Sequence, residues 1–234
     1  MVKRHFPEEI ECARLVLRKH TLSSAPEMYS AVDADRERLR QFLPWVDFTA
    51  SADDEVAYIY QTHGQWDKFE LYDYSLFHKT DGAFLGCAGV HNISWLGGSC
   101  ELGYWILGDF EGSGYMTEAS RALTATAFTM GFHRVEIRCS SENVRSSGVP
   151  RRLGFRYEAR LRESTVNQGV RQDVLVYSML ASEWGKPARS TAEANTSAMA
   201  EFVCNASEPP LRIVALPDFR QSAAASDVTF GRDS

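Results

Sequence analysis

Long apolar runs are missing from this sequence of 234 residues, and none approaches the roughly 20 residues that span a bilayer. The N-terminal segment MVKRHFPEEIECARL begins with basic residues, but Pro7, Glu8 and Glu9 stand where a signal peptide needs an apolar core. We therefore expect no membrane segment, no secretory signal and a cytoplasmic location.

Cysteine is scarce, and the number of cysteines is odd. The five are widely spaced and form no C-x-x-C pair, which argues against a disulfide framework and favours reduced thiols. The six histidines do not cluster with cysteines at zinc-ligand spacings. Cys87 and His91 are four residues apart, but packing in the core explains them better. We expect no metal site.

An excess of positive charge is also missing. The formal net charge is −6, so the global field disfavours binding to nucleic acid, although it leaves a local basic patch open.

The composition changes after Lys186. Residues 187–234 hold four of the eight prolines, are crowded with Ala and Ser and lack a sustained period. This predicts a folded domain over residues 1–186 and a disordered or loosely docked tail over 187–234, in which LRIVALPDF is the one apolar patch.

The domain alternates between the two hydrophobic periods. Helical spacing and capping residues predict helices over 23–32, 33–43, 51–66, 116–130 and 146–155, with serine caps for the first and third. Alternating or continuous apolar residues predict strands over 13–20, 73–79, 84–94, 100–107, 133–140, 156–166 and 170–180, the last two joined by Asn-Gln-Gly, which suits a three-residue loop. This order predicts an α/β or α+β fold with one mixed sheet.

Two glycines mark the junction between a strand and an amphipathic helix, in GDFEGSGYMTEASR (108–121). Gly112 and Gly114 fit a loose turn, which is the simpler interpretation from spacing alone. They also fit a phosphate cradle, because a helix N-terminus presents unpaired N–H donors and the positive end of the helix dipole.

The surroundings favour the second interpretation. The segments ELGYWILGDFEGSGYMTEASRAL, HRVEIRCSSENVRS and RRLGFRYEARLRE resemble the GNAT superfamily of acetyl-CoA-dependent N-acetyltransferases, and in particular its RimJ/RimL branch, which acetylates N-terminal amines of ribosomal proteins. The resemblance covers roughly residues 11–184. It implies a GNAT fold, in which a mixed, mostly antiparallel sheet flanked by helices is split between two parallel strands.

The resemblance also implies where acetyl-CoA binds. The pyrophosphate loop, Q/R-x-x-G-x-G/A in the superfamily, corresponds to 111–116, and the strand before it holds the pantetheine arm and offers backbone donors to the thioester. The implied contacts are Trp105, Ile106, Leu107, Gly112, Ser113, Gly114, Tyr115, Met116, Thr117, Asn143 and Ser146. Glu111 replaces the usual Gln or Arg, which is unfavourable beside a diphosphate unless its side chain turns to solvent. Arg145, Arg151 and Arg152 could attract phosphates, but a solvated surface explains most of these arginines.

Two residues match the branch's proton-transfer positions. Glu101 corresponds to its acidic residue and would deprotonate the amine directly or through water, whereas a solvated edge glutamate is the simpler explanation. Asn143 and Ser146 form an N-x-x-S pattern that fits a helix cap, and the resemblance adds protonation of the thiolate by Ser146. Pro150 stands where many members carry a tyrosine acid, and it suggests that this helix starts late or kinks.

The implied reaction is direct acetyl transfer from acetyl-CoA to a primary amine, in the first place a protein N-terminus. Trp45 and Phe48 would line the acceptor groove or belong to the core. Two alternatives remain open: a small-molecule amine such as an antibiotic, polyamine or peptide toxin, and a CoA-binding regulatory module without turnover. A homodimer is left open.

Overall fold

The computed structural model describes residues 2–186. The chain divides into two compact units, residues 1–182 and 183–234. The tail predicted over 187–234 lies outside the described residues.

One sheet of eight strands forms the centre of the first unit. The strands are β1 (Glu9–Glu11), β2 (Leu15–Lys19), β3 (Tyr72–His78), β4 (Phe84–Ser94), β5 (Ser99–Ile106), β6 (Arg134–Ser140), β7 (Arg156–Asn167) and β8 (Val170–Leu180). Their spatial order is β1-β2-β3-β4-β5-β6-β8-β7. Every neighbouring pair is antiparallel except β5 and β6, which are parallel. This confirms the predicted fold.

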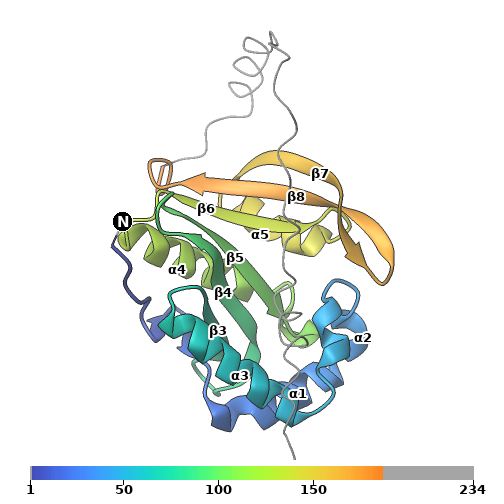
Figure 1. Cartoon of the computed structure of the whole chain (residues 1–234). Helices are drawn as coiled ribbons and strands as arrows, with labels where there is room; N and C mark the ends of the chain where they lie inside the picture. Colours follow the sequence, from blue (N-terminus) through green and yellow to red (C-terminus); the bar gives the residue numbers. More distant parts are fainter. Residues whose placement is uncertain (1, 187–234) are drawn as a thin grey trace, which may run out of the picture. The chain divides into compact units, whose positions relative to one another are not determined.

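Helices cover both faces of the sheet (Figure 1). They are α1 (Ala25–Ala34), α2 (Arg36–Leu39), α3 (Ala52–Asp67), α4 (Tyr115–Thr129) and α5 (Val144–Arg152). Helices α1 and α3 pack together on one face, where Met28 and Ile59 share a core cluster with Phe84 and Cys87 of β4. On the opposite face α4 buries Met116, Ala119, Leu123 and Ala127, which confirms its predicted apolar stripe.

The parallel pair comes apart partway along its length. Residues Ser99–Leu102 of β5 pair with Arg134–Ile137 of β6. Beyond this point β5 continues to Ile106 along β4, whereas β6 continues to Ser140 along β8. The two strands therefore diverge towards their C-terminal ends (Figure 1), and each leaves one edge of backbone N–H and C=O groups without a strand partner.

Several local predictions were wrong in detail. Strand β1 was not expected, and the helix predicted over 33–43 is instead divided between the end of α1 at Ala34 and the short α2, Arg36–Leu39. Ser51 caps α3 through a capping box with Asp54, as predicted, but the Ser24 side chain makes no cap bond to α1.

The hairpin turn also differs from the prediction. Strands β7 and β8 are joined by two residues, Gln168 and Gly169, rather than three. Both have positive φ, 48° and 76°, as a type I′ turn requires. The sequence favoured the longer loop because glutamine adopts positive φ less often than asparagine or aspartate.

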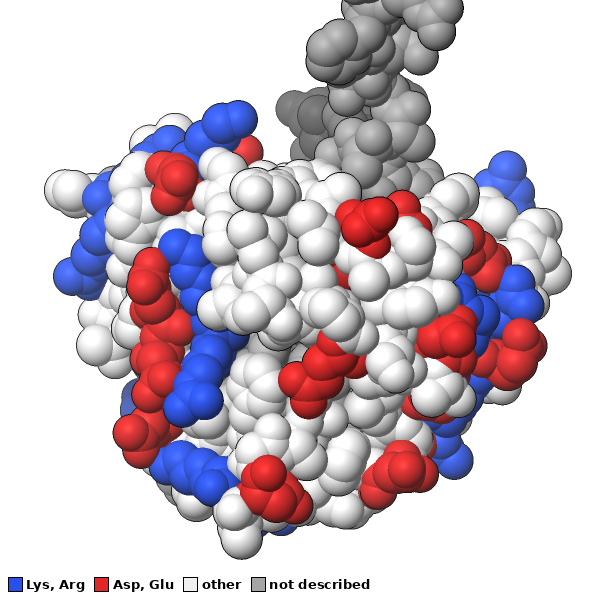
Figure 2. Space-filling model, turned by 90° about the horizontal axis from the view of Figure 1, so that it is seen from below, with Lys and Arg blue, Asp and Glu red and all other residues white. Residues whose placement is uncertain are grey.

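No helix within the described part of the chain is both long and apolar enough to cross a membrane. The face in Figure 2 carries acidic side chains across its breadth, with basic ones mostly towards its sides and close to acids. That face therefore has no continuous basic surface.

One ion pair ties the last three strands of the sheet together. Arg134 of β6 donates through both terminal nitrogens to Glu158 of β7, at 2.9 and 2.6 Å, across the intervening β8. Ser178 of β8 donates to the same carboxylate at 2.6 Å. Hydrogen bonding from Arg134 lowers the pKa of Glu158 to about 2 from its ordinary 4.5.

The lowered pKa of Glu158 makes stability depend on pH. The carboxylate stabilises the folded state above its unfolded pKa, and this contribution is lost as the pH falls from about 4.5 to about 2. We expect Glu158→Gln to lower the melting temperature at pH 7 and to make it fall less steeply across this window. Thermal melts followed by circular dichroism test this, with Glu163→Gln, an exposed acid on the same strand, as control. Parallel curves for wild type and Glu158→Gln below pH 4.5 would contradict it.

Candidate active site

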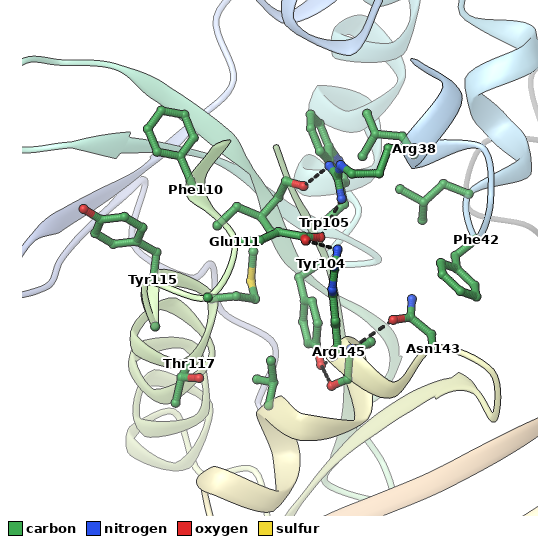
Figure 3. Close-up of a pocket in the computed structure, with 18 of the residues that line it drawn as sticks. Arg38, Phe42, Tyr104, Trp105, Phe110, Glu111, Tyr115, Thr117, Asn143 and Arg145 are labelled. Atoms are coloured by element: carbon green, nitrogen blue, oxygen red, sulfur yellow. Dashed lines mark hydrogen bonds and ion pairs between the residues drawn. The ribbon is translucent and has the colours of Figure 1, made fainter. Parts of the chain in front are cut away.

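A cavity of about 400 Å³ opens where β5 leaves β6. Its walls come from β5, the glycine loop, the first turns of α4 and α5, and the segment that follows α2 (Figure 3). The lining residues are Arg38, Leu39, Gln41, Phe42, Leu43, Tyr104, Trp105, Ile106, Phe110, Glu111, Gly112, Gly114, Tyr115, Met116, Thr117, Asn143, Arg145, Ser146, Val149 and Arg152. Nine of the predicted cofactor contacts are among them, whereas Leu107 and Ser113 are not.

The glycine loop leads into α4 through backbone that favours glycine. Gly112 and Gly114 have φ of 73° and 81°, and Gly114 is the N-cap of α4. A Cβ at Gly112 would meet nothing within 4 Å, so this side of the loop is open. Because Gly114 offers no capping side chain, the first N–H groups of α4 stay available to an anion. These observations fit a phosphate cradle.

Arg14 holds the loop from its other side, a role that the sequence did not indicate. Its Nη1 donates to the Ser113 carbonyl at 2.9 Å. Its Nε and its backbone N–H donate to Glu118 in the first turn of α4, at 2.8 and 2.7 Å. The guanidinium lies 4.5 Å from the Tyr115 ring centroid. Arg14 thus fixes both the loop and the start of the helix.

The sequence indicated that an acid at position 111 is unfavourable beside a diphosphate unless its side chain turns to solvent. In the structure Glu111 does not turn to solvent. Its side chain is 21% exposed. One carboxylate oxygen accepts from Arg38 Nη1 at 2.6 Å, and the other accepts from Arg145 Nη1 (Figure 3). Two arginines therefore compensate the charge that makes an acid unfavourable beside a diphosphate.

The backbone of β5 alternates between β4 and the cavity. The Leu107 N–H donates to the Leu85 carbonyl of β4 at 2.8 Å, so it is not free to serve a ligand as predicted. In an antiparallel ladder the partners alternate, so Tyr104 and Ile106 direct their N–H and C=O groups away from β4. Consistent with this, the Ile106 carbonyl accepts from Arg38 Nη2 at 2.6 Å.

Helix α5 begins at Val144, two residues earlier than predicted, and contains Pro150 in its interior. The Asn143 side chain caps it by accepting from the Ser146 N–H at 3.0 Å. Because Pro150 has no N–H, the Ser146 carbonyl four residues earlier gains no helical partner. The Tyr104 hydroxyl supplies that missing bond at 3.0 Å.

Tyr104 and Ser146 consequently form a hydroxyl pair on the cavity wall. The Ser146 Oγ donates to the Tyr104 hydroxyl at 3.4 Å. Burial raises the pKa of Tyr104 well above its ordinary value, so the phenol stays protonated. The sequence indicated no more than core packing for Tyr104, and only the fold reveals its hydroxyl at this position.

Glu101 lies in a polar cluster on the other face of β5. It is 8% exposed and does not line the cavity. Asn92 donates to its carboxylate at 3.0 Å, and Arg138 Nε lies 3.5 Å away. His91 Nε2 lies 3.9 Å from the second oxygen, and burial lowers the pKa of His91, which keeps this ring neutral. The simpler explanation, that Glu101 is a solvated glutamate at the edge of the sheet, is therefore wrong.

Trp45 and Phe48, which were expected to line the acceptor groove or to belong to the core, are not part of the cavity wall. Trp45 is buried, and its ring centroid lies 5.7 Å from that of Trp105. Phe48 is 62% exposed. Neither lines the cavity, whose corresponding wall comes from Leu39, Phe42 and Leu43.

The fold also gathers one group of residues that sequence spacing separated. Within the described residues, ligand atoms of His20, Asp73 and Cys87 lie within 4.8 Å of one another, all buried. His20 contacts Asp73 at 2.8 Å and Ser75 at 2.7 Å, and Tyr58 donates to Asp73 at 2.6 Å. These hydrogen bonds account for the cluster as part of the core.

Comparison with known proteins agrees with this geometry. Residues 14–156 match the family model of the acetyltransferase (GNAT) domain. The chain is 37% identical over 105 residues to YdaF of Bacillus subtilis, named as a candidate ribosomal N-acetyltransferase, covering 44% of this chain and 57% of YdaF. It is 23% identical to the ribosomal-protein-serine acetyltransferase of Escherichia coli, covering 65% of this chain and 85% of that protein.

Solved structures share the fold. The ribosomal α-N-protein acetyltransferase RimL in complex with coenzyme A superposes with a TM-score of 0.70 at 23% identity, covering 74% of this chain and 98% of RimL. The family model spans more than half of the sequence, including the glycine loop, the diverging strands and the start of α5. The chain belongs to the GNAT acetyltransferase family.

Proposed function

We propose that the protein transfers the acetyl group of acetyl-CoA to a primary amine, namely the N-terminal α-amine of a protein. The observation that carries this proposal is the cavity between β5 and β6, which has a glycine-loop helix N-terminus at one end and an apolar wall of Leu39, Phe42 and Leu43 at the other. One end suits an anionic cofactor and the other an acceptor.

The residues present fit acetyl-CoA, which would supply the activated acetyl group. Gly112, Gly114 and the first turn of α4 offer N–H donors to its diphosphate. Tyr104 and Ile106 direct backbone groups of β5 into the gap, where an extended pantetheine arm can pair as an added strand. Thr117 and Arg152, joined by a 3.0 Å hydrogen bond, close the wall between α4 and α5.

Proton transfer is divided between the two faces of β5. Side chains alternate along a strand, so Glu101 and Trp105 face α1 and α3, whereas Tyr104 faces α5. Glu101 would accept the proton of the incoming ammonium, directly or through water. Ser146, whose hydroxyl adjoins Tyr104 at the cavity, would donate a proton to the departing thiolate.

A protein N-terminus is the acceptor best supported by the relatives, two of which are named for ribosomal acetylation. The net charge of −6 suits a basic protein acceptor. The acceptor wall is held in place by the β7–β8 turn, since Asn167 and Gln168 donate to the backbone carbonyls of Gln41 and Arg40.

The acceptor can be identified directly. The full chain is incubated with labelled acetyl-CoA and a panel of N-terminal peptides, internal-lysine peptides, polyamines and aminated antibiotics, and mass spectrometry locates the acetyl group. We expect acetylation of peptide α-amines. Label found only on small amines would support the small-molecule alternative. Binding of acetyl-CoA with no acetylated product would support a regulatory module.

Replacing Glu101 tests the assignment of the base. Glu101→Gln keeps the size of the side chain and leaves Arg138 paired with Glu136 at 2.8 Å, so the fold should persist. We expect kcat to fall roughly 100-fold or more, as for loss of a general base. The dissociation constant of acetyl-CoA, from calorimetry, should stay within about twofold because Glu101 is away from the cavity wall. Unchanged kcat would remove Glu101 from the mechanism.

Ser146 and Asn143 can be separated because only one of them is needed for the helix. Ser146→Ala removes the hydroxyl but keeps the N–H that Asn143 caps, so kcat should fall roughly tenfold or more with little change in melting temperature. Asn143→Ala removes the cap and should cost about 1 kcal/mol of unfolding free energy. Paired kinetics and thermal melts measure both. Equal destabilisation by the two changes would show that Ser146 has only a structural role.

A further inference from the structure

A chain of ion pairs crosses the mouth of the cavity (Figure 3). Arg145 reaches up from the first turn of α5 to one oxygen of Glu111, and the other oxygen accepts from Arg38 on α2. These ion pairs thus link α5, the glycine loop and α2. Glu111 occupies the position immediately before Gly112, so Arg145 lies beside the backbone donors of the loop.

The two arginines are held very differently. Arg38 is 28% exposed and also contacts both oxygens of Asp35 and the Ile106 carbonyl, so it is fixed at several points. Arg145 is 76% exposed, and among the residues that the structure describes its one ion pair is with Glu111. An exposed pair of this kind contributes little and costs little to break. If this series of ion pairs breaks, it breaks between Glu111 and Arg145.

The position of Arg145 has no explanation in helix stability. It lies in the first turn of α5, which contains no acidic residue. A cation there is repelled by the positive end of the helix dipole. An anion in the cavity would be attracted both by Arg145 and by that same helix end.

We propose that Arg145 is a ligand of the acetyl-CoA diphosphate, and that Glu111 holds it across the cavity mouth until the diphosphate takes its place. This proposal rests on the proposed function. Asp35 and Glu111 balance Arg38 and Arg145 in the free protein. When the diphosphate enters, Arg145 exchanges one carboxylate for a more highly charged group that accepts bidentate hydrogen bonds. Glu111 keeps its bond to Arg38 and stays compensated.

The exchange also explains how an acid is tolerated at position 111. The basic or amide side chain that the superfamily motif places in the loop is absent here, and the positive charge comes from α5 instead. The protein therefore supplies the positive charge from Arg145 of α5 instead of from the loop. Glu111 is the temporary partner that orients the Arg145 side chain.

Isothermal titration calorimetry on the full chain tests this with three ligands: acetyl-CoA, its 3′-dephospho form, which keeps the diphosphate, and acetyl-pantetheine, which lacks it. For Arg145→Gln we expect about tenfold weaker binding of the first two and no change for the third. The salt dependence of acetyl-CoA binding should also weaken. Glu111→Gln should tighten binding of acetyl-CoA several-fold, because Arg145 no longer needs to be released.

Arg171→Gln, an exposed arginine on β8 that does not line the cavity, is the matched control and should leave all three affinities unchanged. Equal weakening of acetyl-pantetheine and acetyl-CoA by Arg145→Gln would overturn the proposal, as would unchanged affinity for acetyl-CoA. Weaker binding of acetyl-CoA by Glu111→Gln would overturn the holding role of Glu111. Failure of the wild type to bind acetyl-CoA would instead overturn the proposed function itself.

Discussion

The end of the pairing between β5 and β6 is the constraint on which the site depends. After Leu102 and Ile137 the two strands follow different neighbours, and the backbone groups between them are left to another partner. The cavity, the gap-facing groups of Tyr104 and Ile106 and the approach of α5 all follow from this separation. A sheet paired along its full length would have no room for a cofactor there.

The opening between β5 and α5 is held by a hydrogen bond that replaces a missing helical one. Pro150 removes a helical hydrogen bond, and the Tyr104 hydroxyl satisfies the carbonyl that is left. This single bond connects β5 to α5 across the opening and places two hydroxyls together. Pro150, which interrupts the hydrogen bonding of α5, thereby helps to position β5.

Compensation of charge is the second organising feature. Glu111 lies between Arg38 and Arg145, Glu101 lies near Arg138, and Glu158 is bound by Arg134. Each of these three carboxylates has a basic neighbour within 4 Å, which offsets part of the cost of taking it out of water. At the cavity the same arrangement pairs both Arg38 and Arg145 with Glu111 in the free protein.

The sequence by itself determined the order of elements, the apolar stripe of α4 and the glycine loop, because these depend on residues close together in the chain. Its motifs also identified nine of the residues that line the cavity. Only the tertiary structure decided the partners of Glu111 and the bond from the Tyr104 hydroxyl to α5. It also decided that Trp45 and Phe48 do not line the cavity. Arg38 and Arg14 lie 73 and 99 residues from the loop groups that they hold, and no local period records such distances. Long-range contacts are chosen by the packing of whole elements, so they emerge only once the sheet and its helices are assembled.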